Sequence, residues 1–593
     1  MSDLPGKRRK SAVILKRLGR IPFIFGLVSI LCIIYDFGFE HHSNEADILR
    51  KIYEITLVVG SISILARYFS RGYRPRLKSV PFDLALLIFL VLVLSNSEIG
   101  GGLIRVRFFS QPFWIYIATI LVFIREFSGL RVEFRRAILN PAQIFVLSFL
   151  SLIVTGTFLL KLPEATVEGI SLTDAFFTSV SAVCVTGLTV VDTGRCFTIF
   201  GQVIILLLFQ AGGLGIMTFT SYFAYFFRGG SSYDSQLAMR DHTRSDRLSE
   251  VFTVLKRIII ITLMIELAGA ILIYRTISPE LMPSLTDRLF FSGFHSVSAF
   301  CNAGFSLISE SFYESTYRFN YPLHLVVAVL IIAGGLGFPI VLNLLRAAKT
   351  ELRSLVRKFL YRKVRIRSPW LVNVNTRLVL ITTLLLLLVG TVAILVLEYD
   401  NTLDEHPFHG KIIAAFFGAV TARTGGFNTV DTAALSIPAT LIIMFLMWVG
   451  ASPASTGGGI KTSTFAVALL SAIGIARGRV RLEVFRREIP DNSVNRAYAI
   501  VFLSVIVIGL SVMLLSIFNP AANYLDICFE SISAFSTVGL SRGITPDLTT
   551  VSKLVLTLTM FIGRVGMLTI LMALFNKGVN GNYRYPSESI LIN

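Results

Sequence analysis

Four segments of the sequence carry a phenylalanine ten residues before a glycine, and each segment lies between two long apolar stretches. They read FTSVSAVCVTGLT at 177–189, FHSVSAFCNAGFS at 294–306, FFGAVTARTGGFN at 416–428 and FESISAFSTVGLS at 529–541. A large apolar residue follows each glycine, and a small polar residue or Asn comes next. A unit of apolar stretch, short helix, glycine-bearing loop and apolar stretch therefore occurs four times in one chain.

The composition places this repeat in a membrane. Of the 593 residues, 54% are hydrophobic and 15% are charged, whereas a soluble domain has about 45–50% apolar and about 25% charged residues. A bilayer core of about 30 Å needs about 20 apolar residues in a spanning helix. Twelve regions meet or approach that length, near 20–37, 52–69, 80–95, 112–126, 142–160, 200–227, 257–275, 323–345, 377–397, 437–475, 498–517 and 551–575.

The net charge of +19 is spread over short loops between the apolar regions, which argues against a nucleic-acid-binding domain. The basic loops fall on alternate sides of the twelve regions, so the positive-inside rule places both termini in the cytoplasm. The longest basic loop, Arg346–Arg377, has ten Lys or Arg and one Glu. Two interpretations of this loop remain: it is a solvated loop that only fixes the topology, or it docks a partner.

Cysteine usage and the N-terminus exclude several classes of protein. The five cysteines are scattered without a CxxC pair, which argues against a zinc site or a disulfide framework. The first apolar run, Ile21 to Tyr35, lacks a clear small-residue cleavage site and is followed by more apolar regions. It is therefore not expected to be a cleavable signal peptide.

The glycine-bearing loops indicate a cation path. Non-helical backbone at membrane depth must be buried in protein or line a water-filled cavity. Four such loops around one axis form a ring of carbonyls, which can replace a cation's hydration shell. The short helices are expected to begin near Asp174, Asp287 and Asp526, with their partially negative C-terminal ends facing the ring. The predicted fold is an all-α polytopic membrane protein with four membrane–pore loop–membrane repeats around one pore, plus an N-terminal transmembrane extension.

Specific motifs carry a family resemblance. With CVTGLTVVDTG at 184–194, FCNAGFS at 300–306, ARTGGFNT at 422–429 and GASPASTGGGIKT at 450–462, the chain resembles the membrane, pore-forming subunits of the Trk/Ktr/HKT superfamily of potassium transporters over about residues 140–575. In the plant branch, a serine in the first filter loop accompanies sodium permeation; here Gly187 favours potassium. The resemblance implies potassium ions held by Val185, Thr186, Gly187, Asn302, Ala303, Gly304, Thr424, Gly425, Gly426, Thr537, Val538 and Gly539.

The segment 450–462 interrupts an apolar region, because Pro453 removes a backbone donor and three glycines loosen the chain. A kinked helix is one interpretation, and the resemblance implies an intramembrane gate below the filter. Arg564, in the middle of the last region, is then either a positive barrier to cations or a structural arginine bonded to loop carbonyls. The gate residues implied are Gly450, Pro453, Ser455, Thr456, Gly457, Gly458, Gly459, Lys461 and Arg564.

Arg423 is the exceptional residue of the third repeat, since Cys184, Cys301 and Ser536 hold the same position three residues before the glycine. We expect it to support the filter from behind, either by hydrogen bonds to the loop or by pairing with an acid such as Glu530. The expected domains are an extension at 1–139 with about four transmembrane helices, followed by repeats at 140–230, 250–346, 370–476 and 495–577.

The resemblance also implies a homodimer in the plasma membrane, which is the inner membrane of a bacterium, and a ring of cytosolic nucleotide-binding regulatory subunits. This chain has no nucleotide fingerprint of its own, since AGGLG and TGGGIKT lie in membrane segments. The alternative function is a potassium symporter coupled to sodium or protons, for which Glu266 is the only clear acid in the middle of a span. An enzyme is not favoured, and His295 is expected in a short helix and not as a ligand.

Overall fold

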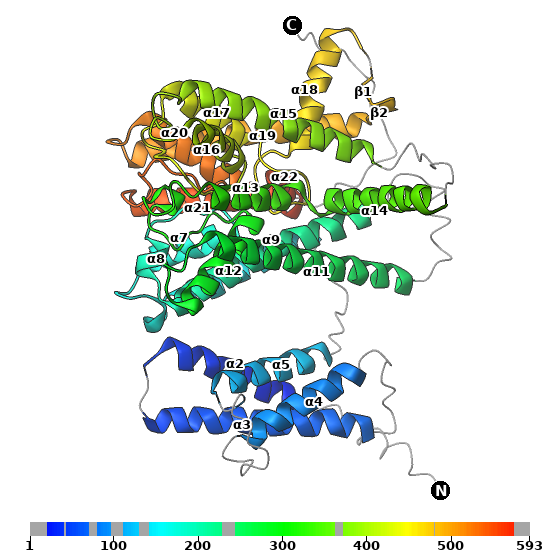
Figure 1. Ribbon diagram of the computed structural model, residues 1–593, viewed down its shortest axis with the longest axis vertical. Coiled ribbons are helices and arrows are strands. Elements are labelled where there is room, and N and C mark those ends of the chain that lie inside the picture. Colours follow the sequence, from blue (N-terminus) through cyan, green and yellow to red (C-terminus); the bar gives the residue numbers. More distant parts are fainter. Residues whose placement is uncertain are drawn as a thin grey trace. The chain divides into compact units, whose positions relative to one another are not determined.

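The computed structural model describes residues 21–40, 43–69, 80–96, 109, 111–129, 141–227, 244–361, 372–479 and 481–574. The predicted all-helical membrane fold is confirmed (Figure 1). Within these residues the only strands, β1 (Glu483–Val484) and β2 (Arg487–Glu488), form one small antiparallel hairpin. The chain divides into two compact units, residues 1–138 with 162–164, and residues 139–161 with 165–593.

The first unit is a bundle of four helices, α2 (Ile21–Gly38), α3 (Ser43–Phe69), α4 (Val80–Ser95) and α5 (Phe113–Gly129). Helix α2 lies against α3 and α5, and α4 also contacts α3 and α5. Leu57, Leu86, Leu90 and Val122 are buried between them. Of the four helices, α2 is long and apolar enough to cross a membrane by itself.

Two buried ion pairs join α5 to its neighbours in this bundle. Asp83 of α4 is only 1% exposed, and its carboxylate accepts hydrogen bonds from Arg125 Nε at 2.5 Å and from the Tyr68 hydroxyl at 2.8 Å. Arg67 of α3 pairs with the buried Glu126 of α5. Because burying a charge without a partner is costly, each pair depends on both of its members.

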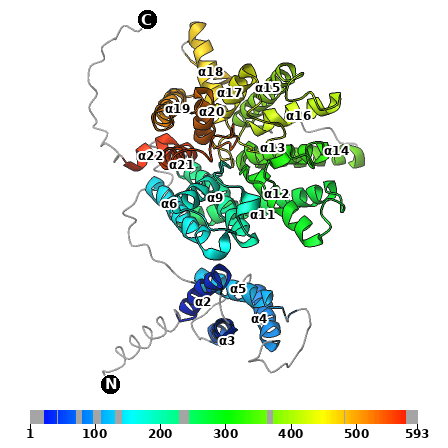
Figure 2. The same ribbon diagram turned by 90° about the vertical axis from the view of Figure 1, so that its left-hand side faces the viewer.

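The second unit contains the four repeats, each with a short helix between longer ones. The short helices α7 (Leu172–Val183), α12 (Leu285–Cys301), α16 (Phe408–Thr421) and α20 (Tyr524–Ser536) contact the long helix that precedes them, and Figure 2 shows α12, α16 and α20 among the longer helices. The helices are α6 (Pro141–Leu160), α7 (Leu172–Val183), α8 (Thr193–Cys196), α9 (Ile199–Phe227), α11 (Arg244–Thr276), α12 (Leu285–Cys301), α13 (Tyr321–Leu336), α14 (Phe338–Tyr361), α15 (Val374–Leu397), α16 (Phe408–Thr421), α17 (Ile437–Trp448), α18 (Thr462–Ala476), α19 (Asp491–Phe518), α20 (Tyr524–Ser536), α21 (Thr550–Val565) and α22 (Met567–Leu574), with short 3-10 turns at Pro163–Ala165 and Ser311–Tyr313.

The repeats are joined in a closed cycle. A long helix of each repeat contacts the short helix of the next one: α9 meets α12, α13 meets α16, α17 meets α20, and α21 meets α7. The last contact brings the fourth repeat back to the first. Each short helix is therefore held by a neighbouring repeat as well as by its own.

Three of the short helices begin two residues before the aspartates near which they were predicted to start, and their N-caps lie three residues before these aspartates. Ser171 and Ser284 are the N-caps of α7 and α12, and their hydroxyls accept hydrogen bonds from the backbone N–H groups of Asp174 and Asp287. In α20 the N-cap is Asn523, again three residues before the expected aspartate. The aspartates lie in the first turn, where a carboxylate stabilises the positive end of a helix.

The chain turns sharply inside two of the predicted apolar regions. The region 323–345 bends by 102° between α13 and α14 at Gly337, and the region 551–575 bends by 89° between α21 and α22 at Gly566. Residues 346–361 of the predicted basic loop belong to α14. The expected interruption of 437–475 is present, with residues 449–461 between α17 and α18. By length and composition, six described helices can cross a membrane, or eight if each bent pair is one span.

Replacing Asp83 by Asn should destabilise the first unit by about 3–5 kcal/mol, because the Arg125 guanidinium would stay buried without its carboxylate. Trp114 in α5 reports on this unit, so its fluorescence during denaturation measures the effect once Trp370 and Trp448 are replaced by Phe. Asp47→Asn removes the same charge from an exposed position of α3 and should change the stability by less than about 0.5 kcal/mol. Equal effects of the two substitutions would contradict the importance of the buried pair.

Candidate functional site

The four repeat glycines share one backbone conformation. Gly187, Gly304, Gly426 and Gly539 have φ values of 87°, 69°, 77° and 91°. The residue two positions before each glycine is also left-handed, with φ of 55° at Val185, 58° at Asn302, 72° at Thr424 and 49° at Thr537. A left-handed conformation is costly for a residue with a side chain. Its presence in all four repeats shows that the surrounding structure imposes the same path on each loop.

Each of the four glycines lies against the glycine of a neighbouring repeat or the residue directly before it, and these contacts close into a ring, which we call the glycine ring. A Cβ atom added to Gly187 would lie 2.4 Å from the Ala303 carbonyl oxygen, and one added to Gly304 would lie 2.8 Å from Gly426 Cα. A Cβ on Gly426 would lie 2.7 Å from the Val538 oxygen, and one on Gly539 would lie 2.3 Å from the Thr186 oxygen. No side chain fits at any of the four positions.

The oxygens nearest the glycine ring come from equivalent residues. Thr186, Ala303, Gly425 and Val538 each directly precede a ring glycine, and their carbonyls lie close to the glycine of a neighbouring repeat. The short helices end just before them, so the partial negative charge of four helix ends points to the same place. Uncharged oxygens in a ring, backed by negative helix ends, are suited to bind a dehydrated cation.

A buried hydroxyl at the end of three short helices holds the loop that follows. Ser181 Oγ donates to the Leu188 carbonyl at 2.7 Å, and Ser298 Oγ donates to the Phe305 carbonyl at 2.8 Å. In the third repeat Thr421 Oγ1 donates to the Phe427 carbonyl at 2.6 Å. The third repeat has Val-Thr where the other three repeats have Ser-Ala. Its hydroxyl therefore lies one residue later in the sequence, and the hydrogen bond is kept.

A second polar contact occurs at the same register in two repeats. The residue nine positions before the ring glycine binds the serine two positions after it: His295 with Ser306, and Glu530 with Ser541. His295 Nδ1 donates to the Phe291 carbonyl at 2.9 Å, so Nε2 accepts from the Ser306 hydroxyl at 3.1 Å. His295 therefore lies in a short helix, as expected, and supports the loop behind the ring.

Glu530 is the centre of a denser network in the fourth repeat. Its fully buried carboxylate accepts from the Ser541 hydroxyl at 2.5 Å, from the Arg542 backbone N–H at 3.0 Å and from the Thr545 hydroxyl at 3.0 Å. The Arg542 guanidinium binds Asp526 at 2.6 Å and the carbonyl oxygens of Thr432 and Ala433, each at 2.9 Å. Arg542 thus ties the fourth repeat to the third.

Glu398 fixes the far end of the third repeat. This buried residue follows α15, and its Oε1 accepts from the Ser436 backbone N–H at 2.9 Å and from the Ser436 hydroxyl at 2.6 Å. Burial raises the pKa of this carboxyl group, but hydrogen bonds from Ser436, Thr402 and Asn401 outweigh that effect and lower the pKa below its ordinary value. The ionised carboxylate therefore joins the end of α15 to the start of α17.

A cavity of about 400 Å³, which we call the glycine cavity, opens on one side of the ring. All four ring glycines line it, together with the polar residues two positions after them. The cavity also receives the side chains or backbone of Asp192, Glu310 and Asp431. Its acidic groups favour cations at the entrance to the ring.

Residues 449–461, which we call the interrupting loop, meet the ring from the other side. A Cβ on Gly457 would lie 2.2 Å from Thr424 Oγ1, and one on Gly458 would lie 2.1 Å from Thr537 Oγ1. Thr456 Oγ1 donates to the Phe300 carbonyl at 3.2 Å. The run of glycines is needed here because the loop backbone lies directly against the residues that precede the ring.

Bonds to other helices hold the interrupting loop in place. The Ser452 backbone N–H and hydroxyl both bind the Gly335 carbonyl, at 3.0 and 2.9 Å. Phe338 N–H donates to the Ala454 carbonyl at 3.2 Å, next to the bend between α13 and α14. All the predicted gate residues except Arg564 lie within this loop, where the Ser455 hydroxyl donates to the Ser452 carbonyl at 2.6 Å.

Arg423 reaches the interrupting loop from behind the ring. Its side chain is 8% exposed, and Nη2 donates to the Gly450 carbonyl at 3.1 Å. Arg423 therefore makes a hydrogen bond to a loop, as predicted, but the acceptor belongs to the interrupting loop and not to the filter loop that contains Arg423. The alternative pairing with Glu530 is not found among the described residues, since that carboxylate binds Ser541, Thr545 and Arg542.

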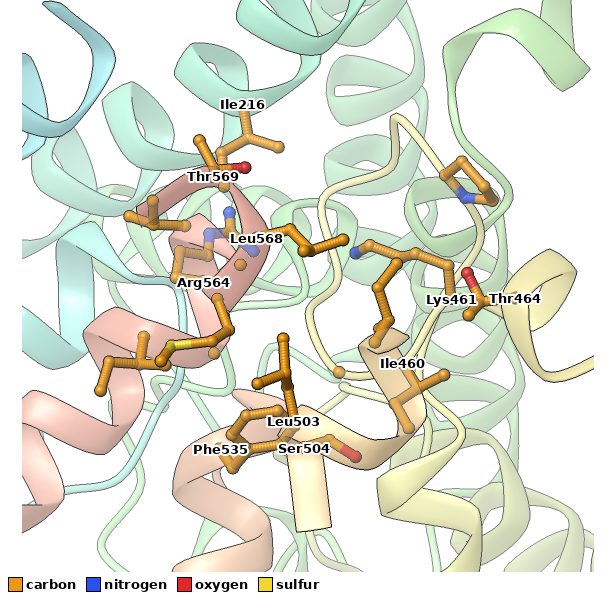
Figure 3. Close-up of a pocket in the computed structure, with 18 of the residues that line it drawn as sticks. Ile216, Ile460, Lys461, Thr464, Leu503, Ser504, Phe535, Arg564, Leu568 and Thr569 are labelled. Carbon is orange, nitrogen blue, oxygen red and sulfur yellow. The ribbon is translucent and has the colours of Figure 1, made fainter. Parts of the chain in front are cut away.

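Arg564 and Lys461 line a second cavity, of about 280 Å³, which we call the Arg564 cavity (Figure 3). Arg564 Nη1 donates to the Thr456 carbonyl, and Lys461 Nζ donates to the Gly457 carbonyl at 2.6 Å. Arg564 therefore bonds loop carbonyls, as one interpretation of the sequence expected. The same hydrogen bond holds the positive charge of Arg564 beneath the ring. This position is also the one required if Arg564 is a barrier to cations.

Glu266 lies apart from both cavities. It is 5% exposed in α11, and its carboxylate accepts from Gln210 Nε2 at 3.0 Å and lies 3.9 Å from Cys301 Sγ. It is not among the residues that line the glycine cavity or the Arg564 cavity. Glu266 thus supports the second repeat from behind and does not face the ring.

Sequence reasoning did not identify Arg542 or the shared register of His295 and Glu530. An alignment of the repeats nine positions before the glycine would have revealed two polar residues there, with Thr178 and Phe417 in the other repeats. Arg542 gave no such signal because two of its acceptors, the carbonyls of Thr432 and Ala433, lie in the third repeat, far away in the sequence.

Comparisons with known proteins show what the chain resembles. Residues 109–580 match the TrkH family model, described as a cation transport protein. The chain is 35% identical over 453 residues to the Ktr system potassium uptake protein B of Bacillus subtilis, covering 76% of this chain and 96% of that protein. It is 34% identical to the potassium/sodium uptake protein NtpJ of Enterococcus hirae, covering 77% and 97%.

A solved structure has the same fold. The potassium transporter TrkH from Vibrio parahaemolyticus superposes with a TM-score of 0.57 at 18% identity, covering 89% of this chain and 98% of that chain. At this identity, the match supports the fold alone.

Replacing Glu530 by Leu should lower the midpoint of thermal unfolding, because three donors lose their buried acceptor at about 1–3 kcal/mol each. Glu530→Gln keeps one oxygen acceptor and should have a smaller effect. Thr178→Val is the matched control, since Thr178 has the same register in the first repeat and its buried hydroxyl makes no hydrogen bond to the described residues. If all three variants unfold at the same temperature, the network does not stabilise the loop.

Proposed function

Because the chain belongs to the TrkH family of cation transport proteins, we propose that it takes up potassium ions across the plasma membrane, the inner membrane of a bacterium, through the glycine ring. The closed contact of four glycines with the carbonyl oxygens of their neighbours is the observation that carries this proposal. The name of the Bacillus subtilis relative, a potassium uptake protein, supports potassium as the ion.

The proposed filter consists of the ring glycines and the two residues before each of them. Backbone oxygens from successive positions can bind an ion in successive sites as it moves. Gly187 occupies the place where a serine accompanies sodium permeation in the plant branch, which favours potassium here. The residues proposed to bind potassium are Val185, Thr186, Gly187, Asn302, Ala303, Gly304, Thr424, Gly425, Gly426, Thr537, Val538 and Gly539.

The interrupting loop is the proposed gate. Its glycines lie against Thr424 and Thr537, directly under the proposed filter. Arg423 holds one end of the loop and Arg564 holds the Thr456 carbonyl. Opening the gate therefore requires these bonds to break or move, and the positive charge of Arg564 opposes cations while they persist. The proposed gate residues are Gly450, Pro453, Ser455, Thr456, Gly457, Gly458, Gly459, Lys461 and Arg564.

The proposed assembly is a homodimer with a cytosolic ring of nucleotide-binding regulatory subunits. The Bacillus subtilis relative is named as part of a Ktr system, which supports a partner for this chain. Both termini are proposed to lie in the cytoplasm, on the same side as the basic stretch 346–361 of α14. That stretch is suited to dock an acidic partner or anionic lipid headgroups.

A symporter coupled to sodium or protons is the alternative, and the name of the Enterococcus hirae relative includes sodium. A coupled mechanism needs a titratable or ion-binding group beside the path. Glu266 lines neither cavity, which supports uncoupled flux.

Rubidium uptake into liposomes tests the proposal directly. The purified chain should carry rubidium and potassium down their own gradients, without sodium and without an imposed proton gradient. Flux that requires either second ion would establish the symporter, and the absence of flux in the presence of the regulatory partner would overturn the proposal.

Gly187→Ser should reduce the preference for potassium over sodium about tenfold or more, because the new Cβ would lie 2.4 Å from the Ala303 carbonyl and must displace it. A tenfold change corresponds to about 1.4 kcal/mol of selective binding. Competition of sodium with rubidium uptake measures the ratio. Gly293→Ser, at a helical position with open space, is the control and should leave the ratio unchanged. An unchanged ratio in Gly187→Ser would remove that glycine from the filter.

A further inference from the structure

The Arg564 cavity combines two basic side chains with mainly apolar walls. The interrupting loop forms one part of its lining, and α19, α20, α21 and α22 form most of the rest. Figure 3 shows the Lys461 side chain pointing toward the side of the cavity on which Arg564 and Leu568 lie. No acidic residue is among the described residues that line the cavity.

Arg564 has donors that no protein group uses. The residue is 6% exposed, and Nη1 binds the Thr456 carbonyl. Its Nε and Nη2 atoms are buried and make no hydrogen bond to any described residue. Buried donors of a charged group are normally paired, because leaving them unpaired costs more than for neutral groups. The cavity is the space in which a partner for these donors can lie.

We propose that the Arg564 cavity binds a small monovalent anion of halide size, held by Arg564 and Lys461. A volume of about 280 Å³ accommodates such an ion with several waters. The apolar walls favour a weakly hydrated anion, since a phosphate or sulfate would lose more hydration than two cations and a few hydroxyls restore. The anion is a counter-ion and is not carried through the ring.

The consequence of anion binding for transport rests on the proposed function. Two positive charges beneath the ring repel a potassium ion that leaves it. An anion between them cancels part of that repulsion while the bonds to the Thr456 and Gly457 carbonyls remain. Cation flux then increases with occupancy of the anion site.

Binding is tested without reference to transport. The midpoint of thermal unfolding of the purified full-length chain is measured at fixed potassium and ionic strength while gluconate is replaced by chloride, bromide or nitrate. The wild-type midpoint should rise saturably, and the rise should be lost in Arg564→Gln. Lys553→Met, which removes a charge paired with Asp174 outside the cavity, should keep the full anion-dependent rise.

Leu568→Trp provides a second variant in case Arg564→Gln does not fold. It leaves both cations in place and fills the cavity that Leu568 lines, so the anion-dependent rise should again be lost. Crystals grown with bromide should show anomalous scattering beside Arg564 in the wild type. The proposal would be overturned if the unfolding midpoint did not change with the anion, or if it rose equally in Arg564→Gln. It would also be overturned if only anionic lipid raised the midpoint.

Flux measurements form a separate arm of the experiment. Wild-type rubidium uptake should be faster in chloride than in gluconate, whereas Arg564→Ala should be faster than wild type in gluconate and insensitive to the anion. Lower flux in Arg564→Ala at equal protein yield would contradict the barrier. If the chain carried no cation at all, the proposed function would fail while the binding measurement still decided the anion site.

Discussion

The packing of each ring glycine against the carbonyl of a neighbouring repeat is the contact on which the second unit depends. The oxygens of Thr186 and Ala303 lie 2.3 and 2.4 Å from where a Cβ of the adjoining glycine would be, so the loops can approach this closely only with glycine at these positions. The approach is held from outside by a cycle of helix contacts in which α21 returns to α7. A ring closed in this way can present oxygens to an ion at fixed spacing, because no loop can move without displacing its neighbour.

The four repeats reach the same geometry with different side chains. The first three use a hydroxyl at the end of the short helix, and the third moves it by one residue to Thr421. The second and fourth add a contact from His295 or Glu530 to a serine beyond the ring. The third and fourth repeats each contribute a buried arginine, Arg423 or Arg564, that binds a carbonyl of the interrupting loop. The chemical asymmetry lies around the ring, while the ring itself stays nearly fourfold.

Much of the fold and of the candidate site could be predicted from the sequence. The fixed offset from phenylalanine to glycine located all four ring glycines, and Pro453 with the glycines after it located the interrupting loop. The first residues of the short helices were harder to predict, because N-caps such as Ser171 lie three residues before the aspartates near which the helices were expected to begin. The bends at Gly337 and Gly566 were missed because apolar composition continues through them, and a hydropathy pattern does not record a change of direction.

The sequence by itself determined that this chain is a helical membrane protein with a fourfold unit, because apolar length and residue spacing are properties of each segment alone. Only the tertiary structure decided which groups meet across repeats. Arg423 could reach several acceptors, and the position of residues 449–461 made Gly450 its partner. The carboxylate of Glu530 instead binds Ser541 and Arg542 of its own repeat. Such choices depend on which helices become neighbours, and hydrogen bonds act only over a few ångströms, so no local pattern contains them.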